Sequence, residues 1–197
     1  MDDTIKSARE IALEKVEKLG QATQEERLGW KYFPLGETLA AKYLRDDVNL
    51  LGELGQYQGD AKKYVAHSAS EVLIRNIGLP KNEAAKKKNK KTMDGLKLLK
   101  DDKVGVENVY SRFRYLFAHY EEQGEQQRQQ AYQSLKADME VRIQQALQQQ
   151  LGTAAAGKID IEKQPQFQQE WRKVQAQLDS AYLVHLNEYR QAISAIV

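Results

Sequence analysis

The residues in this sequence most able to do chemistry are lysines that gather between residues 81 and 100. Eight lysines and two acidic residues give this stretch a charge of +6, while the whole chain carries a formal charge of +2, so the remainder carries −4. Clustered lysines neutralise phosphates and release counterions, which predicts salt-dependent, sequence-independent binding to RNA, DNA or another polyanion. The candidate binding residues are Lys86, Lys87, Lys88, Lys90 and Lys91.

The composition of the same stretch favours a less specific interpretation. Readout of bases uses arginines and stacked aromatic side chains, and residues 81–100 contain neither. The lysines are therefore expected on the solvated face of a helix or in a mobile basic linker. Contact with an acidic partner or an anionic membrane surface is a further alternative.

Histidine and glutamate pairs form a second candidate constellation. Each of the three histidines has a glutamate three or four residues later, which places both side chains on one face of a helix. Such pairs build carboxylate-bridged metal sites inside helical bundles, but acids are frequent enough here for the spacing to arise by chance. We therefore predict no metal cofactor. The pairs are His67 with Glu71, His119 with Glu122, and His185 with Glu188.

Other catalytic patterns are missing from the sequence. The chain contains no cysteine, so disulfides, thiolate metal sites and thiol nucleophiles are excluded. It contains no glycine-rich phosphate loop, no GxSxG and no HExxH motif. These observations predict a protein that is not an enzyme and needs no cofactor.

The composition predicts an all-α protein. Charged residues make up 29% of the chain and aromatic residues only 8%, and only three prolines interrupt a mixture rich in good helix formers. The N-terminus lacks the basic start and apolar run of a signal peptide, and no apolar stretch approaches the roughly 20 residues of a membrane span. We expect a cytoplasmic protein without a membrane span.

Residues 1–104 are expected to form a bundle of short amphipathic helices. Thr23 and Glu26 have the spacing of a capping box for a helix that should stop before Pro34. Apolar spacing then predicts another helix from Leu35 to Leu54. The lysine-rich stretch is a fifth helix or a linker.

Residues 105–197 are expected to form a long antiparallel helical hairpin that resembles a coiled coil, with its loop at about 151–165. An apolar stripe runs from Val106 to Tyr120, resumes at Tyr132, and is broken by ten residues without an apolar side chain. We call residues 121–130 the polar waist, and expect it to face solvent all round. The second helix, from Phe167 to Ile196, has nearly heptad spacing and includes His185 in its apolar stripe.

The second helix carries more large apolar side chains than an interrupted partner stripe can cover. The surplus can be covered by the N-terminal helices, by a second copy of the chain or by a different protein. Because an exposed apolar patch marks an interaction site, and homodimers are the commonest oligomers, we predict self-association or binding to another protein. The leading prediction is a non-enzymatic interaction or assembly protein, a scaffold or adaptor; the alternatives are the polyanion binder and a helical-bundle metalloenzyme. The predicted interface residues are Tyr182, Leu186, Tyr189 and Ile193.

Overall fold

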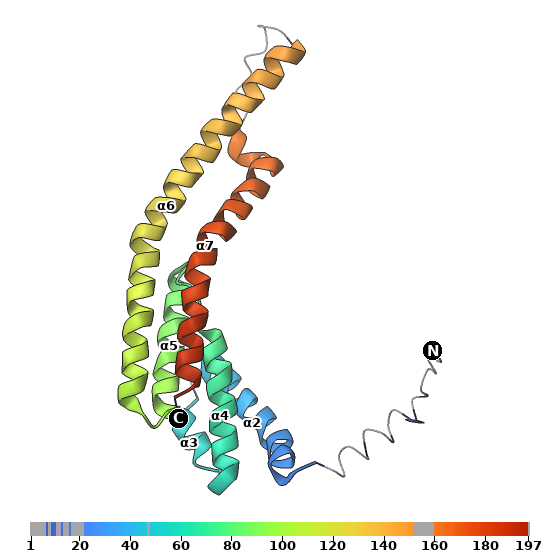
Figure 1. Ribbon diagram of the computed structural model, residues 1–197, viewed down its shortest axis with the longest axis vertical. Helices are drawn as coiled ribbons and strands as arrows, with labels where there is room; N and C mark the ends of the chain where they lie inside the picture. Colours follow the sequence, from blue (N-terminus) through green and yellow to red (C-terminus); the bar gives the residue numbers. More distant parts are fainter. Residues whose placement is uncertain are drawn as a thin grey trace. The chain divides into compact units, whose positions relative to one another are not determined.

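The computed structural model describes residues 7, 9–10, 13, 16, 22–46, 48–151 and 160–196. All the regular elements in these ranges are helical, which confirms the predicted all-α class (Figure 1). The elements are α2 (Gln24–Asp46), α3 (Leu50–Leu54), α4 (Gly59–Asn76), α5 (Glu83–Leu99), α6 (Lys103–Leu151), the short 3₁₀-helix η2 (Ile161–Lys163) and α7 (Pro165–Ser194).

The described residues group into two compact units. The first unit consists of the residues up to Leu73 together with Asp94–Leu99. The second consists of Ile74–Met93 and the residues from Lys100 onward. Helices α4 and α5 therefore contribute residues to both units.

Helix α2 of the first unit begins as the sequence predicts and ends much later. The capping box is confirmed, because the Glu26 amide donates to Thr23 Oγ1 (3.2 Å) and the Thr23 amide donates to Glu26 Oε2 (2.8 Å). The helix continues through Pro34 to Asp46, so the predicted stop before Pro34 is wrong. The predicted helix from Leu35 to Leu54 is likewise divided, since α3 starts separately after its N-cap Asn49.

Packing against α4 explains how α2 tolerates its proline. A Cβ on Gly36 would lie 2.3 Å from the Val65 carbonyl oxygen, so the two helices approach as closely as backbones can. Ser68 Oγ of α4 donates a 2.7 Å hydrogen bond to the Phe33 carbonyl, next to the proline. These tertiary contacts outweigh the one helical hydrogen bond that a proline removes.

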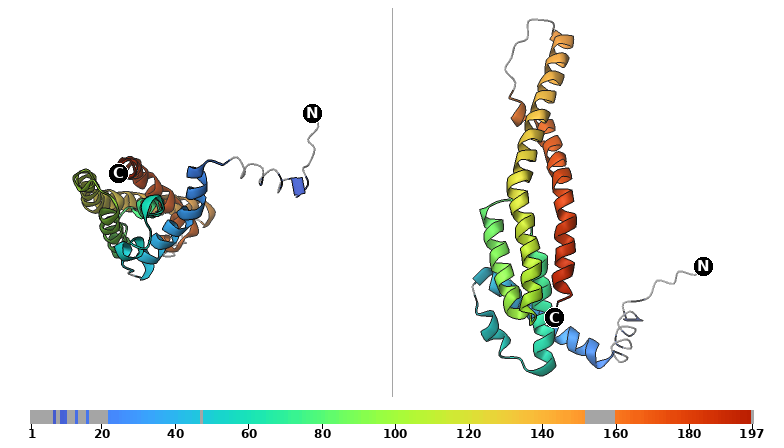
Figure 2. Two further views of the ribbon diagram at one scale, coloured as in Figure 1. Left: turned by 90° about the horizontal axis from the view of Figure 1, so that it is seen from below. Right: turned by 60° about the vertical axis from the view of Figure 1, so that its left-hand side comes forward.

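Helices α6 and α7 of the second unit lie side by side and run in opposite directions (Figures 1 and 2). Helix α6 is continuous over 49 residues, so it passes through the polar waist without a break. Of the predicted loop, residues 152–159 lie outside the described ranges, η2 follows, and Pro165 already belongs to α7. The contacts that set the register are Phe113 with Tyr189, Tyr120 with Asp179, Tyr132 with Phe167, and Lys136 with Glu162.

The polar waist does not face solvent on every side, which corrects the sequence-based expectation. Gly124, in the middle of the waist, is buried. A Cβ at this position would lie 3.1 Å from the hydroxyl oxygen of Tyr182 on α7. The absence of a side chain at Gly124 therefore lets α7 approach α6 where no apolar residue is present.

Candidate functional site

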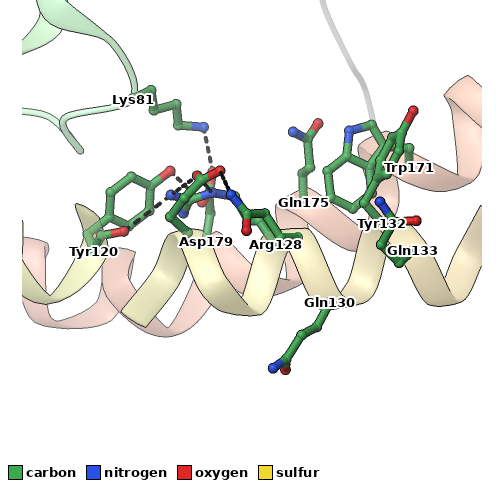
Figure 3. A pocket seen from close by; sticks show the side chains of 11 residues that line it. Lys81, Tyr120, Arg128, Gln130, Tyr132, Gln133, Trp171, Gln175 and Asp179 are labelled. Atoms are coloured by element: carbon green, nitrogen blue, oxygen red, sulfur yellow. Dashed lines mark hydrogen bonds and ion pairs between the residues drawn. The ribbon is translucent and has the colours of Figure 1, made fainter. Parts of the chain in front are cut away.

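A groove of about 910 Å³ lies in the second unit beside the polar waist. It is formed by residues of α6 and α7 and by one lysine from the loop between α4 and α5 (Figure 3). We call it the waist groove. Its lining consists of Lys81, Tyr120, Glu125, Arg128, Gln129, Gln130, Tyr132, Gln133, Trp171, Gln175 and Asp179.

Asp179 is a buried carboxylate at one end of the waist groove, with only 5% of its surface exposed. Tyr120 Oη donates to its Oδ1 (2.9 Å) and Lys81 Nζ donates to its Oδ2 (2.5 Å). A buried carboxylate requires such donors, because leaving it unpaired in an apolar environment is costly. Burial, followed by the hydrogen bond to Asp179, raises the pKa of Tyr120 to about 12. Tyr120 is consequently a neutral donor at physiological pH.

The loop that carries Lys81 is held by hydrogen bonds within the second unit. The Asn89 side chain of α5 accepts from the Gly78 amide (2.9 Å) and donates to the Gly78 carbonyl (2.7 Å). Arg190 Nε of α7 donates to the Ile77 carbonyl (3.0 Å), and burial lowers the pKa of this arginine. Lys81 therefore reaches Asp179 from a fixed backbone, although 59% of its own side chain is exposed.

Arg128 covers the same end of the groove. Its guanidinium lies 4.3 Å from the centre of the Tyr120 ring, a cation–π contact, and donates to the Tyr120 carbonyl and to Glu125 Oε2. The hydrogen bonds from Arg128 lower the pKa of Glu125. Arg128 Nη1 is buried, without a hydrogen-bond partner in the described part of the chain, and a Cβ on Gly124 would lie 3.1 Å from it.

The other end of the groove is aromatic and amide-rich. The Tyr132 ring meets the rings of Phe167 and Trp171 edge to face, at centroid distances of 5.3 and 5.1 Å. The side chains of Gln133 and Gln175 lie beside Tyr132 and Trp171 in Figure 3. The apolar cluster that supports this end contains Met139, Ile161 and Phe167, packed against Tyr132, Leu135 and Ile143.

The chemistry of the groove favours binding over proton transfer. Its four charged side chains form two pairs, Lys81 with Asp179 and Arg128 with Glu125, so the lining carries no net charge. The raised pKa of Tyr120 keeps its hydroxyl protonated near neutral pH, so this side chain does not act as a base there. What remains for a ligand is one aromatic surface and a set of neutral amides.

The five candidate lysines lie on α5 and not in the groove. Lys86 forms ion pairs with Glu83 and with Glu121 of α6, both at 2.8 Å, and these carboxylates raise its pKa. Lys91 is half-buried. The three exposed members are Lys87, Lys88 and Lys90.

The three histidines make different contacts. The His67 ring is tilted against the Phe33 ring at a centroid distance of 6.0 Å, and His119 Nδ1 is 3.0 Å from Tyr182 Oη. His185 is exposed and contacts Glu188 Oε2 at 3.1 Å, so its predicted place in the apolar stripe is wrong. In the described ranges, no three histidine, aspartate or glutamate side chains gather as metal ligands would.

The predicted interface residues lie mostly inside the chain. Leu186 and Ile193 are fully buried and Tyr182 is nearly so. Tyr189 is half-buried and meets Phe113 edge to face at 5.6 Å. The chain itself therefore covers these side chains, and their use as an interface for self-association stays a prediction.

Sequence reasoning missed the residues that build the charged end of the waist groove. A signal for Asp179 was present, because it precedes Tyr182 by three residues and Leu186 by seven, which places it on their face of α7. An acid on the buried face of one helix, opposite a polar gap in the other, indicates a polar layer between them. Arg128 and Tyr120 carry no comparable signal.

The fold and the groove define an all-α protein with a long helical hairpin and a lateral groove. The chain belongs to a family of unknown function, DUF6657, whose model matches residues 51–195. All residues of the waist groove lie within the matched range, whereas α2 lies before it. No curated protein and no solved structure matches the chain. None of the described helices has the length and apolar character needed to cross a membrane.

Proposed function

We propose that this protein is a non-enzymatic helical interaction protein that binds a partner protein through the waist groove. The observation that carries the proposal is the joint placement of Trp171, Tyr132 and neutral amides on the two helices of one hairpin. Tryptophan and tyrosine are the side chains that most often dominate binding energy at protein interfaces. The groove is also held in shape before a partner arrives, which reduces the entropy cost of binding.

The hydrogen bonds made by Asp179 support this proposal over a catalytic function. Both oxygens of Asp179 accept hydrogen bonds, from Tyr120 and from Lys81, and the residue is only 5% exposed, so its remaining lone pairs are poorly accessible to a substrate. A general base or nucleophile needs a free lone pair directed at a substrate. The groups that are available instead belong to an aromatic ring and to amides, which recognise a ligand without reacting with it.

Affinity purification with matched baits tests the proposal. The baits are the wild-type protein, Trp171→Ala, and Trp30→Ala as the control, since Trp30 is exposed in the first unit. Quantitative mass spectrometry should find a partner that is enriched with the wild type and the control and lost with Trp171→Ala. If the same proteins are recovered with all three baits, the waist groove is not the binding surface.

A second candidate function is the polyanion binder predicted from the lysine-rich stretch. It is favoured by the exposure of Lys87, Lys88 and Lys90 along α5. Their charges are available for phosphates, whereas Lys86 is engaged with two carboxylates. Self-association and a cytoplasmic location stay predictions of the sequence.

A further inference from the structure

We infer that the waist groove takes an extended, uncharged peptide segment of the partner, with a large apolar side chain seated against Trp171. The inference rests on the proposed function and specifies the chemistry of the partner. Four properties of the groove carry it: its charge balance, its unpartnered amides, its length and its aromatic end.

The charge balance selects against a charged ligand. Figure 3 shows Lys81, Arg128 and Asp179 close together at one end of the groove. Each of their charges is compensated, at 2.5 Å between Lys81 and Asp179 and at 2.9 Å between Arg128 and Glu125. A charged side chain that entered the groove would lose hydration without gaining a free counter-charge. An uncharged segment avoids this cost.

The unpartnered amides fit a peptide backbone. The side chains of Gln133 and Gln175 make no hydrogen bond with any described residue. A glutamine amide offers two N–H donors and a carbonyl acceptor, so it can pair with the carbonyl and the N–H of a peptide unit together. Extended backbone is the conformation that leaves these groups free, because a helix satisfies them internally.

The length of the groove corresponds to a short segment. Along α7 the lining extends eight helical steps from Trp171 to Asp179, or about 12 Å at 1.5 Å per residue. Along α6 it extends thirteen steps from Tyr120 to Gln133, or about 20 Å. An extended peptide advances about 3.3 Å per residue, so the groove accommodates about four to six residues.

The aromatic end provides the anchor for the segment. Trp171 is half-buried, and its ring packs against Tyr132 at 82° between the ring planes, which holds it in one orientation. A rigid indole surface that is partly exposed gains by burial of a large apolar side chain. The neighbouring Gln175 lies one helical turn further along α7, where it can bond the backbone of the anchored residue.

Peptide selection with an internal probe tests the inference. A phage-displayed library of random eight-residue peptides is selected on the full chain, and the enriched peptides are synthesised. Because the chain has only two tryptophans, a Trp30→Phe background makes Trp171 the sole indole fluorophore. The matched variants are Gln175→Ala and Gln177→Ala, the second being the control because Gln177 is exposed and outside the groove.

The inference expects an uncharged consensus with one large apolar residue and a change in Trp171 fluorescence on binding. Gln175→Ala should weaken binding about three- to tenfold and Trp171→Ala about thirtyfold or more, while Gln177→Ala leaves it within about twofold. Affinity should change less than about twofold between 50 and 300 mM salt, because no charge is neutralised.

Several outcomes would overturn the inference. They are the recovery of no peptide, a charged consensus with strongly salt-dependent affinity, or binding that persists in Trp171→Ala. These outcomes are separable from failure of the proposed function. If the partner found by affinity purification still requires Trp171 but is not displaced by any selected peptide, the groove binds a partner by another chemistry. If the partner is recovered equally well with the wild type and with Trp171→Ala, the proposed function itself fails.

Discussion

The polar waist and the apolar sections of the hairpin join the same two helices by different means. On one side of the waist, Phe113 of α6 meets Tyr189 of α7, and on the other Tyr132 meets Phe167. Between them the contact is made by Asp179 with its two donors and by the close approach at Gly124. Apolar packing stabilises without direction, whereas the hydrogen-bonded layer demands one register.

This difference explains why the groove lies where it does. Apolar side chains interdigitate and fill the space between two helices. At the waist, most side chains of α6 are polar and remain partly hydrated, so the helices are bridged without being fully packed. The comparison therefore predicts large losses of stability from changes in the apolar sections and smaller, pH-dependent losses from changes at the waist.

The largest effect is expected from Leu186, which is fully buried. Leu186→Ala should lower the free energy of unfolding by about 2–5 kcal/mol, because it removes buried apolar surface and leaves a cavity. Leu186→Asp should cost more, since it adds a buried charge without a partner. Urea unfolding followed by circular dichroism measures both.

Leu183 is the matched control on the same helix, because it is exposed. Leu183→Asp should change the free energy of unfolding by no more than about 0.5 kcal/mol. If Leu186 instead lay in the interface predicted from the sequence, Leu186→Asp would mainly abolish dimerisation. A folded, monomeric Leu186→Asp protein in light scattering would restore that interpretation and contradict the burial seen here.

The apolar stripes in the sequence allowed both long helices to be predicted. The polar layer between the two helices could not be predicted from them. The stripes from Val106 to Tyr120 and from Phe167 to Ile196 contain enough buried positions to define a helix and its inner face. The exposure of residues 121–130 depends on what α7 places opposite them. Only the register shows that Tyr182 lies opposite Gly124 and that Asp179 bonds Tyr120 at the edge of the waist. The residue pattern of a single helix does not contain that information.

The error at Pro34 has a similar cause. Local rules stop a helix before a proline, because the ring removes one N–H donor and clashes with the preceding turn. The compensation comes from Gly36 and Ser68, and Ser68 is 35 residues away from the carbonyl that it binds. The division into residues 1–104 and 105–197 also depends on contacts distant in sequence, and it stays a prediction.

The second effect concerns the buried carboxylate of the waist. Asp179→Ala should lower the free energy of unfolding by about 1–3 kcal/mol, because the buried Tyr120 hydroxyl loses its acceptor. Asp179→Asn should lose less, since its amide carbonyl can still accept from Tyr120. Asp138→Ala, at an exposed position of α6, is the control and should be nearly neutral. Equal stability of all three variants would show that the layer contributes nothing.

The third effect is a pH dependence that comes from Tyr120, next to the waist. The folded protein raises the pKa of Tyr120 from about 10 to about 12. The folded state therefore favours the protonated phenol, and its contribution to stability is complete below pH 10 and is lost as the pH rises towards 12. Wild-type protein should lose more stability than Tyr120→Phe between pH 9 and 12, as measured by thermal unfolding. Parallel losses in the two proteins would contradict the raised pKa.

The smallest effect is expected from the five candidate lysines of α5, of which Lys86 contacts the waist. Lys86 pairs with Glu121 at 2.8 Å, yet both side chains are more than a third exposed, so solvent screens the pair. Replacing Lys86, Lys87, Lys88, Lys90 and Lys91 together by Gln should therefore lower the free energy of unfolding by at most about 1 kcal/mol.

The same variant tests the polyanion hypothesis by fluorescence anisotropy with mixed-sequence RNA and DNA. Binding by the wild type should fall steeply between about 50 and 200 mM salt and be lost in the variant. If the wild type binds neither nucleic acid at low salt, that hypothesis is removed, and a large loss of stability would show that this exposed ion pair contributes as much as the buried layer at Asp179.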